Sequence, residues 1–172
     1  YGGAVGVPAQ PTPDTVTLTR YLDPHCPGLP TEIEDPEHAV TRTTYDATCT
    51  FPMSVTNALG HTTVDTYYGV NGVPYTGKER GVAIAGRYGQ LRSSTDPNGA
   101  QTWSGYDEWG RPTVTVGPYD ADGRPGARVS YQDPVLFSET GVFPIPARVK
   151  TETWDDMQHA YINSYAFGDG QT

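Results

Sequence analysis

The sequence predicts an all-β fold, an antiparallel meander of β-hairpins that forms a twisted strip or open sheet with little or no helix. Turn-forming tetrapeptides recur about 11 residues apart, a spacing typical of meandering sheets. Between them, apolar and polar residues alternate with the period of a strand. The chain also holds 12 Tyr and 3 Trp and is rich in Thr, and these residues suit a pleated, half-buried surface.

Each turn signal begins with Asp or Asn, and most end with Gly. The first side chain accepts hydrogen bonds from the backbone of the turn that it opens. A fourth-position Gly reaches the left-handed backbone region that completes a bulged hairpin turn. His38 is one of the few other residue types that enter this region readily, whereas Cys49 fits the pattern worst. These corners lie at 35–38, 46–49, 57–60, 96–99, 107–110 and 120–123, and a further step falls at Tyr68, just before 69–72.

Strand patterns occupy the stretches between the corners. Near the start, residues 16–22 alternate, and 51–56 and 62–67 follow as the two arms of a hairpin. Residues 113–116 alternate as Thr-Val-Thr-Val. A last hairpin is expected from 148–154 and 161–167, with its turn at 155–159. Apolar residues nowhere recur at helical spacing with caps, so helix should be scarce.

The same patterns suggest a division of the chain. Residues 1–13, rich in Gly and Pro, read as an N-terminal arm or linker, and 14–131 read as the hairpin array. Residues 69–89 interrupt the array as an insertion, either an extended hairpin or a surface loop. Residues 132–146 form a Pro-rich connection, and 147–172 form the terminal hairpin.

The net charge of −9 is spread along the chain without an acidic run or a basic cluster. Because clustered Lys and Arg are what bind phosphate backbones, we expect no nucleic-acid partner. No apolar run approaches the ~18 residues of a membrane span. The first residues do not form a secretion signal, so we expect any such signal to lie outside this chain or to have been removed.

Cys26 and Cys49 are the only cysteines. An even count, together with few Lys and many Thr, Tyr and Gly, is consistent with an exported protein. One disulfide between them is our interpretation, and two separate buried thiols are the alternative. We therefore expect a secreted, extracellular or cell-surface protein.

The sequence offers little for catalysis, and we expect no enzyme, no metal and no cofactor. It contains no nucleophile elbow, phosphate-binding loop or zinc-protease motif. His25 adjoins Cys26, but neighbours on a strand point to opposite faces. Glu32 and Glu34 share a face, as glycosidase carboxylates do, yet so do the charges of many solvated strand edges. The carboxylates of 120–123 lack the closing Glu of a calcium loop and are better explained as turn caps.

A repeated signature accompanies the corners. Tyr precedes the opening Asp of three corners, at Tyr45-Asp46, Tyr106-Asp107 and Tyr119-Asp120. Gly110-Arg111 and Gly123-Arg124 complete the pattern Tyr-Asp-x-x-Gly-Arg at the last two. Residues 88–111 resemble a full YD repeat of the RHS family, which includes insecticidal toxin complex B and C shell proteins, SpvB-like proteins, polymorphic toxins and teneurins. The signature residues are Asp35, His38, Tyr45, Asp46, Asn57, Gly60, Tyr67, Asp96, Gly99, Tyr106, Asp107, Gly110 and Arg111.

This resemblance implies a long hairpin strip that closes into a shell around a toxin or peptide cargo. The chain is long enough for only a strip of such a shell, and no stretch matches the family's C-terminal self-cleaving aspartyl site. We expect a non-catalytic structural module with shell or scaffold function. Its expected partners are other repeats of the same or neighbouring chains, with a protein cargo, a surface glycan or a second copy as further candidates. An adhesive or carbohydrate-binding module, using Trp103 and Trp109, and a subunit of an extracellular filament are the alternatives.

Overall fold

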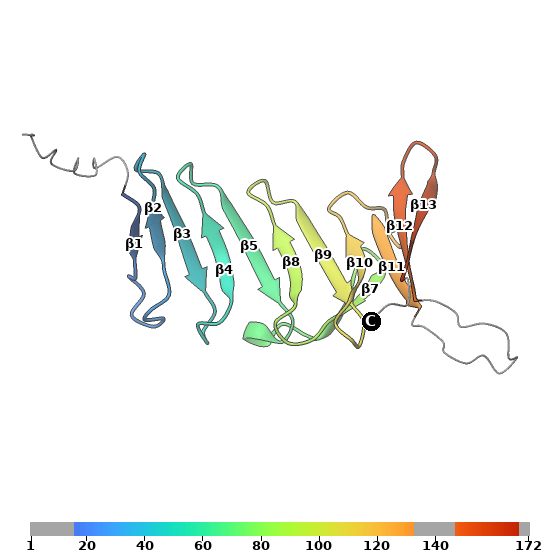
Figure 1. Ribbon diagram of the computed structural model, residues 1–172, viewed down its shortest axis with the longest axis horizontal. Coiled ribbons are helices and arrows are strands. Elements are labelled where there is room, and N and C mark those ends of the chain that lie inside the picture. Colours follow the sequence, from blue (N-terminus) through green and yellow to red (C-terminus); the bar gives the residue numbers. More distant parts are fainter. Residues whose placement is uncertain (1–15, 133–146, 169–172) are drawn as a thin grey trace, which may run out of the picture. The chain divides into compact units, whose positions relative to one another are not determined.

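The structure, a computed structural model, describes residues 16–132 and 147–168 (Figure 1). Within these residues the chain is nearly all strand and turn, which confirms the all-β prediction. The large sheet has the strand order β1-β2-β3-β4-β5-β8-β9-β10-β11-β12-β13, and β6 and β7 form a separate hairpin. The strands are β1 (Leu18–Arg20), β2 (Glu32–Glu34), β3 (Val40–Tyr45), β4 (Pro52–Thr56), β5 (Thr62–Tyr67), β6 (Thr76–Glu79), β7 (Val82–Ala85), β8 (Leu91–Thr95), β9 (Gln101–Tyr106), β10 (Pro112–Val116), β11 (Ala127–Gln132), β12 (Arg148–Asp155) and β13 (Ala160–Phe167).

The chain divides into two units, residues 1–64 and 65–172, and each is described by itself. The boundary falls inside the predicted array of 14–131. The predicted arm of 1–13 and nearly all of the predicted connection of 132–146 lie outside the described residues. No helix in the described ranges is long and apolar enough to cross a membrane.

In the first unit, antiparallel pairing places charges of opposite sign beside one another. Glu32 lies between Arg20 and Arg42 in the register of β1, β2 and β3. Its carboxylate contacts Arg42 Nε at 2.6 Å, and Glu34 contacts Arg20 at 2.6 Å. The carboxylates that sequence analysis weighed as a glycosidase pair are therefore engaged by arginines. They stabilise strand pairing, to which cross-strand ion pairs contribute roughly 0.2–1 kcal/mol each.

The first unit has little apolar core. Among its described residues, Cys26 is the buried hydrophobic side chain, and Asp46 is buried beside it at the strand ends. Ile33 and Val55, by contrast, are each about two-fifths exposed on the strands. The tightest packing of this unit is consequently found at a corner.

In the second unit, the core forms where the 69–89 segment packs on the sheet. This segment contains a short 3-10 helix, Val70–Gly72, followed by the hairpin β6–β7. Tyr68, Ile84 and Val116 form the buried cluster, and Trp103 packs against its edge. The segment is thus an extended hairpin rather than a surface loop. Its approach to the sheet depends on Gly105, where a Cβ atom would lie 2.7 Å from the Val114 side chain and 3.4 Å from Ile84.

The tip of the β6–β7 hairpin has an unusual residue for its geometry. Glu79 pairs with Val82, so Arg80 and Gly81 form a two-residue turn. Both have positive φ, 45° for Arg80 and 77° for Gly81, as a type I′ turn requires. Asn is the favoured first residue of this turn, because its short amide can hydrogen-bond locally, whereas the Cβ atom of most other L residues is strained in the left-handed region.

Candidate functional site

Four corners share one hydrogen-bonding pattern. In each, the fourth residue has a positive φ and donates its N–H to the carbonyl oxygen of the first, as at His38 and Gly60. The first side chain accepts two further backbone N–H groups, those of the third and fifth residues. Asp35, Asn57, Asp96 and Asp107 all make this pair of bonds, at 2.8–3.0 Å.

The 46–49 corner is longer by one residue. Asp46 N–H bonds to the carbonyl of Phe51, whereas the first residue of the other four corners bonds to the residue four positions on. Cys49 nevertheless has the positive φ, 56°, of the fourth position. The Asp46 carboxylate accepts the N–H groups of Thr48, Thr50 and Phe51 at 2.7–2.9 Å, and also the Thr48 hydroxyl. Burial by itself raises the pKa of Asp46, but these donors outweigh it and hold the pKa well below its usual value.

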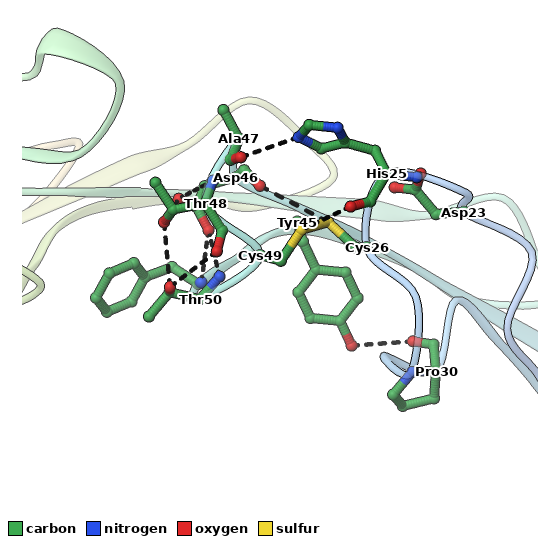
Figure 2. The surroundings of a disulfide bond; sticks show 11 residues. Asp23, His25, Cys26, Pro30, Tyr45, Asp46, Ala47, Thr48, Cys49 and Thr50 are labelled. Atoms are coloured by element: carbon green, nitrogen blue, oxygen red, sulfur yellow. Dashed lines mark hydrogen bonds between the residues drawn. A yellow bond between two sulfur atoms is a disulfide. The ribbon is translucent and has the colours of Figure 1, made fainter.

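Cys26 and Cys49 are joined in a disulfide with a Cα–Cα distance of 5.3 Å (Figure 2). The bond fastens the β1–β2 connection to the 46–49 corner. Beside it, His25 Nε2 donates to the Ala47 carbonyl at 2.9 Å, a second link between the same two loops. Because the Cys26 sulfur is bonded to another sulfur, it forms no thiol–imidazole pair with His25.

The two signature tyrosines that precede Asp make equivalent contacts. Tyr45, the last residue of β3, donates its hydroxyl to the Pro30 carbonyl at 2.9 Å (Figure 2). Tyr106, the last residue of β9, donates to the Leu91 carbonyl at 3.1 Å. In both cases the acceptor lies at or just before the start of the preceding neighbouring strand. Each Tyr therefore ties the end of its strand to the adjacent hairpin.

The same two corners are followed by a register shift. Tyr45 pairs with Pro52 and the preceding Thr44 pairs with Ser54, so one residue of β4 is bulged. On β9 and β10, Tyr106 pairs with Pro112, and the register then shifts before Val114. Proline lacks the N–H that a ladder would use, and a bulge is where a strand tolerates it.

Arg111 links the 107–110 corner to the next hairpin. Its Nε donates to Asp107 at 2.7 Å, and its guanidinium lies 4.2 Å from the centre of the Tyr131 ring. Tyr131 in turn donates its hydroxyl to the Pro112 carbonyl at 2.8 Å. Burial raises the pKa of Asp107, but the N–H groups and guanidinium of Arg111 and the Trp109 N–H lower it below its usual value. Arg111 thus fixes both its own corner and the neighbouring strand.

The sequence pattern assigns the signature position to Tyr67, but in the structure the neighbouring Tyr68 is the buried residue. Tyr67 is half-buried, and burial raises the pKa of its hydroxyl, with the Asp65 charge adding to the effect. Tyr68 is fully buried and donates its hydroxyl to Ser104 O at 2.7 Å. Its ring also meets Tyr106 edge-on at 6.3 Å, a ring contact between the residue after β5 and the end of β9. No periodic signal distinguishes these two adjacent tyrosines, so the sequence pattern did not identify the core residue.

The remaining candidate acids also serve turns. Asp120 departs from the corner pattern, because its carboxylate accepts Gly117 N–H at 2.7 Å and Gly126 N–H, closing a wider loop. Asp155 accepts the N–H groups of Met157 and Gln158. In the described ranges, no three His, Cys, Asp or Glu side chains are grouped as a metal site would need.

Residues 87–118 match the family model of the RHS Repeat. The match covers β8, β9 and β10 with the corners at 96–99 and 107–110, so it contains the Tyr106–Leu91 and Arg111–Asp107 contacts described above. The resemblance to the YD/RHS-repeat family is thereby confirmed for this stretch. No curated protein matches the chain.

Proposed function

We propose that this RHS-repeat chain is a non-catalytic wall segment of a secreted or cell-surface protein, which acts as a shell or scaffold around a protein cargo. The proposal rests on one observation. Three signature side chains, Tyr45, Tyr106 and Arg111, are occupied in fastening neighbouring strands or hairpins to one another, and the Cys26–Cys49 bond does the same covalently.

The two units use different groups for the same link. Cys49 and Gly110 are both the fourth residue of a Tyr-Asp corner. Cys49 is bonded to Cys26 in the loop before β2, and Gly110 accepts at its carbonyl a hydrogen bond of 2.9 Å from Gln90, just before β8. A wall that must stay closed needs this kind of hairpin-to-hairpin link, because an antiparallel sheet with little apolar core would otherwise open at its corners.

The enclosure is tested in the full-length secreted protein by limited proteolysis. In the wild type, we expect segments beyond residues 1–172 to be protected from protease. Tyr45→Phe combined with Tyr106→Phe should expose them by weakening one link in each unit. Met157→Ala, at a turn side chain that is 94% exposed, is the control and should change nothing.

Rapid cleavage of these segments in all three proteins, the wild type included, would refute enclosure. Turnover of glycoside or ester substrates by the purified chain would refute the non-catalytic assignment. Electron micrographs of regular fibres would instead support the filament alternative, in which β13 pairs with a second copy. In the part of the chain that the structure describes, β13 has β12 as its one strand partner.

A further inference from the structure

A hollow of about 330 Å³ lies in the second unit where three connections meet. Its lining comes from the β6–β7 tip, the 96–99 corner with the start of β9, and the loop after β10. The side chains that matter are Arg80, Asn98, Gln101, Trp103, Pro118 and Tyr119. The volume is at the low end of the roughly 300–1,000 Å³ typical of small-molecule sites.

Two aromatic rings line this hollow and differ in their support. Trp103 is half-buried and packs against the core cluster of Tyr68, Ile84 and Val116, so its position is fixed. Tyr119 is 91% exposed. Together the two rings expose flat apolar surface to water, and exposed apolar surface of this kind is typical of ligand-binding sites.

Among the described residues that line the hollow, Arg80 carries the one charge, and it is positive. Arg80 donates to the Asp120 carbonyl at 3.2 Å, which uses one of its five N–H groups. None of the described residues that line the hollow carries a carboxylate. The nearby Asp120 carboxylate is turned to the N–H groups of Gly117 and Gly126. The Asn98 and Gln101 side chains add amide groups.

Arg80 also occupies a position where its residue type is unfavourable. Its φ of 45° in a type I′ turn favours Asn. The backbone contact of this position, from Gly123 N–H to the Arg80 carbonyl at 2.7 Å, would be available to any residue. A strained residue whose backbone role needs no particular side chain points to a function for the side chain itself.

We propose that this hollow binds a carboxylate-bearing sugar, with the apolar face of the ring on Trp103 and Tyr119 and the carboxylate on Arg80. A guanidinium binds a carboxylate through two parallel hydrogen bonds, which a neutral sugar cannot form. The amides of Asn98 and Gln101 are suited to ring hydroxyls. This site is independent of the wall function, since none of its side chains makes the links described above.

The test follows the amide and indole signals of the isotope-labelled chain by NMR during titration with glucuronate, glucose and acetate. Glucuronate should shift the Trp103 indole signal, with glucose and acetate binding at least tenfold more weakly. Absence of saturable shifts with glucuronate, or equal affinity for glucose, would overturn the proposal. A glycan array then distinguishes two sources of the carboxylate-bearing sugar, a free sugar and a uronic or sialic acid at the end of a glycan chain.

Arg80→Asn is the decisive variant, because Asn suits the turn but removes the cation. It should weaken glucuronate binding at least tenfold while leaving the thermal midpoint unchanged or higher. Tyr119→Ala should weaken glucuronate and glucose alike. Trp109→Ala, at a 71% exposed ring on another corner, is the matched control and should bind like the wild type. Undiminished binding by Arg80→Asn, or a lower midpoint, would show that Arg80 serves the hairpin and would refute the assignment.

Discussion

Replacing Cys26 and Cys49 together by alanine should lower the stability of the first unit by about 3 kcal/mol. The two cysteines are 23 residues apart, and closing a loop of this length removes roughly that much chain entropy from the unfolded state at 25 °C. Typical domains have only about 5–15 kcal/mol of total stability. Because Cys26 is also the buried hydrophobic residue among the described residues of this unit, no larger apolar cluster within residues 16–64 compensates for the loss.

A second variant separates the cross-link from the backbone geometry. Cys49 has a φ of 56°, where alanine is strained and glycine is not. Cys26→Ala with Cys49→Gly should therefore be about 1 kcal/mol more stable than the double alanine variant. The matched control in the second unit is Gln90→Ala, which removes the hydrogen bond to the Gly110 carbonyl and the one accepted from Arg87 N–H, and should cost only about 2 kcal/mol.

Urea denaturation gives the total stability, and amide hydrogen exchange read by mass spectrometry locates the change. Exchange should accelerate in β2, β3 and β4 of the double alanine variant and remain unchanged in β8, β9 and β10. Adding reductant to the wild type should reproduce the pattern. Equal acceleration in both sets of strands, or none in the first, would refute the idea that this bond holds its own unit together.

Three other predictions concern single side chains. Burial raises the pKa of Tyr68 to about 12, so its contribution to stability is complete below pH 10 and is lost as pH rises from 10 toward 12. Tyr68→Phe should remove this alkaline loss of stability, measured by urea denaturation at a series of pH values in that range. The lowered pKa of Asp46 gives the opposite pH dependence: its contribution to stability is complete above pH 3.8 and declines as pH falls below that value. Asp46→Asn should therefore reduce the loss of stability at acid pH, and an unchanged loss would contradict this prediction. Arg111→Ala should destabilise the second unit by about 1 kcal/mol, measured by thermal denaturation, and Tyr131→Leu should make that substitution less costly because the two side chains share a contact.

The corners could be predicted from sequence because their chemistry is local. An Asx side chain that caps its own turn and a fourth residue that reaches positive φ need only four or five neighbouring residues. By the same reasoning Cys49 fits the fourth position of a corner worst, because cysteine rarely occupies that backbone region. The structure shows why the position is held: the left-handed geometry is that of the other corners, and the side chain is bonded to Cys26.

The contacts between hairpins could not be predicted in this way. Neither the acceptor of each tyrosine hydroxyl nor the stacking of Arg111 on Tyr131 follows from spacing, because both depend on which strand ends lie side by side. The role of the 69–89 segment was open for the same reason. Ile84 packs closely over Gly105 of the underlying strand β9, where a larger residue would hinder its approach. The residues around Ile84 and those around Gly105 contain no local signal that the two segments meet. Long-range packing overrode local pattern at these sites.

The two units show how one hairpin architecture can be stabilised with different amounts of core. The second unit buries Tyr68, Val70, Ile84 and Val116, and a hydrogen bond from Gln90 suffices at its Tyr-Asp corner. The first unit lacks such a cluster among its described residues, and a covalent bond occupies the corresponding corner. Small apolar cores commonly accompany disulfides because cross-linking lowers the entropy of the unfolded chain where burial cannot supply enough free energy. Because thiols keep the cytosol reducing and would remove this compensation, the arrangement is compatible with an extracellular protein.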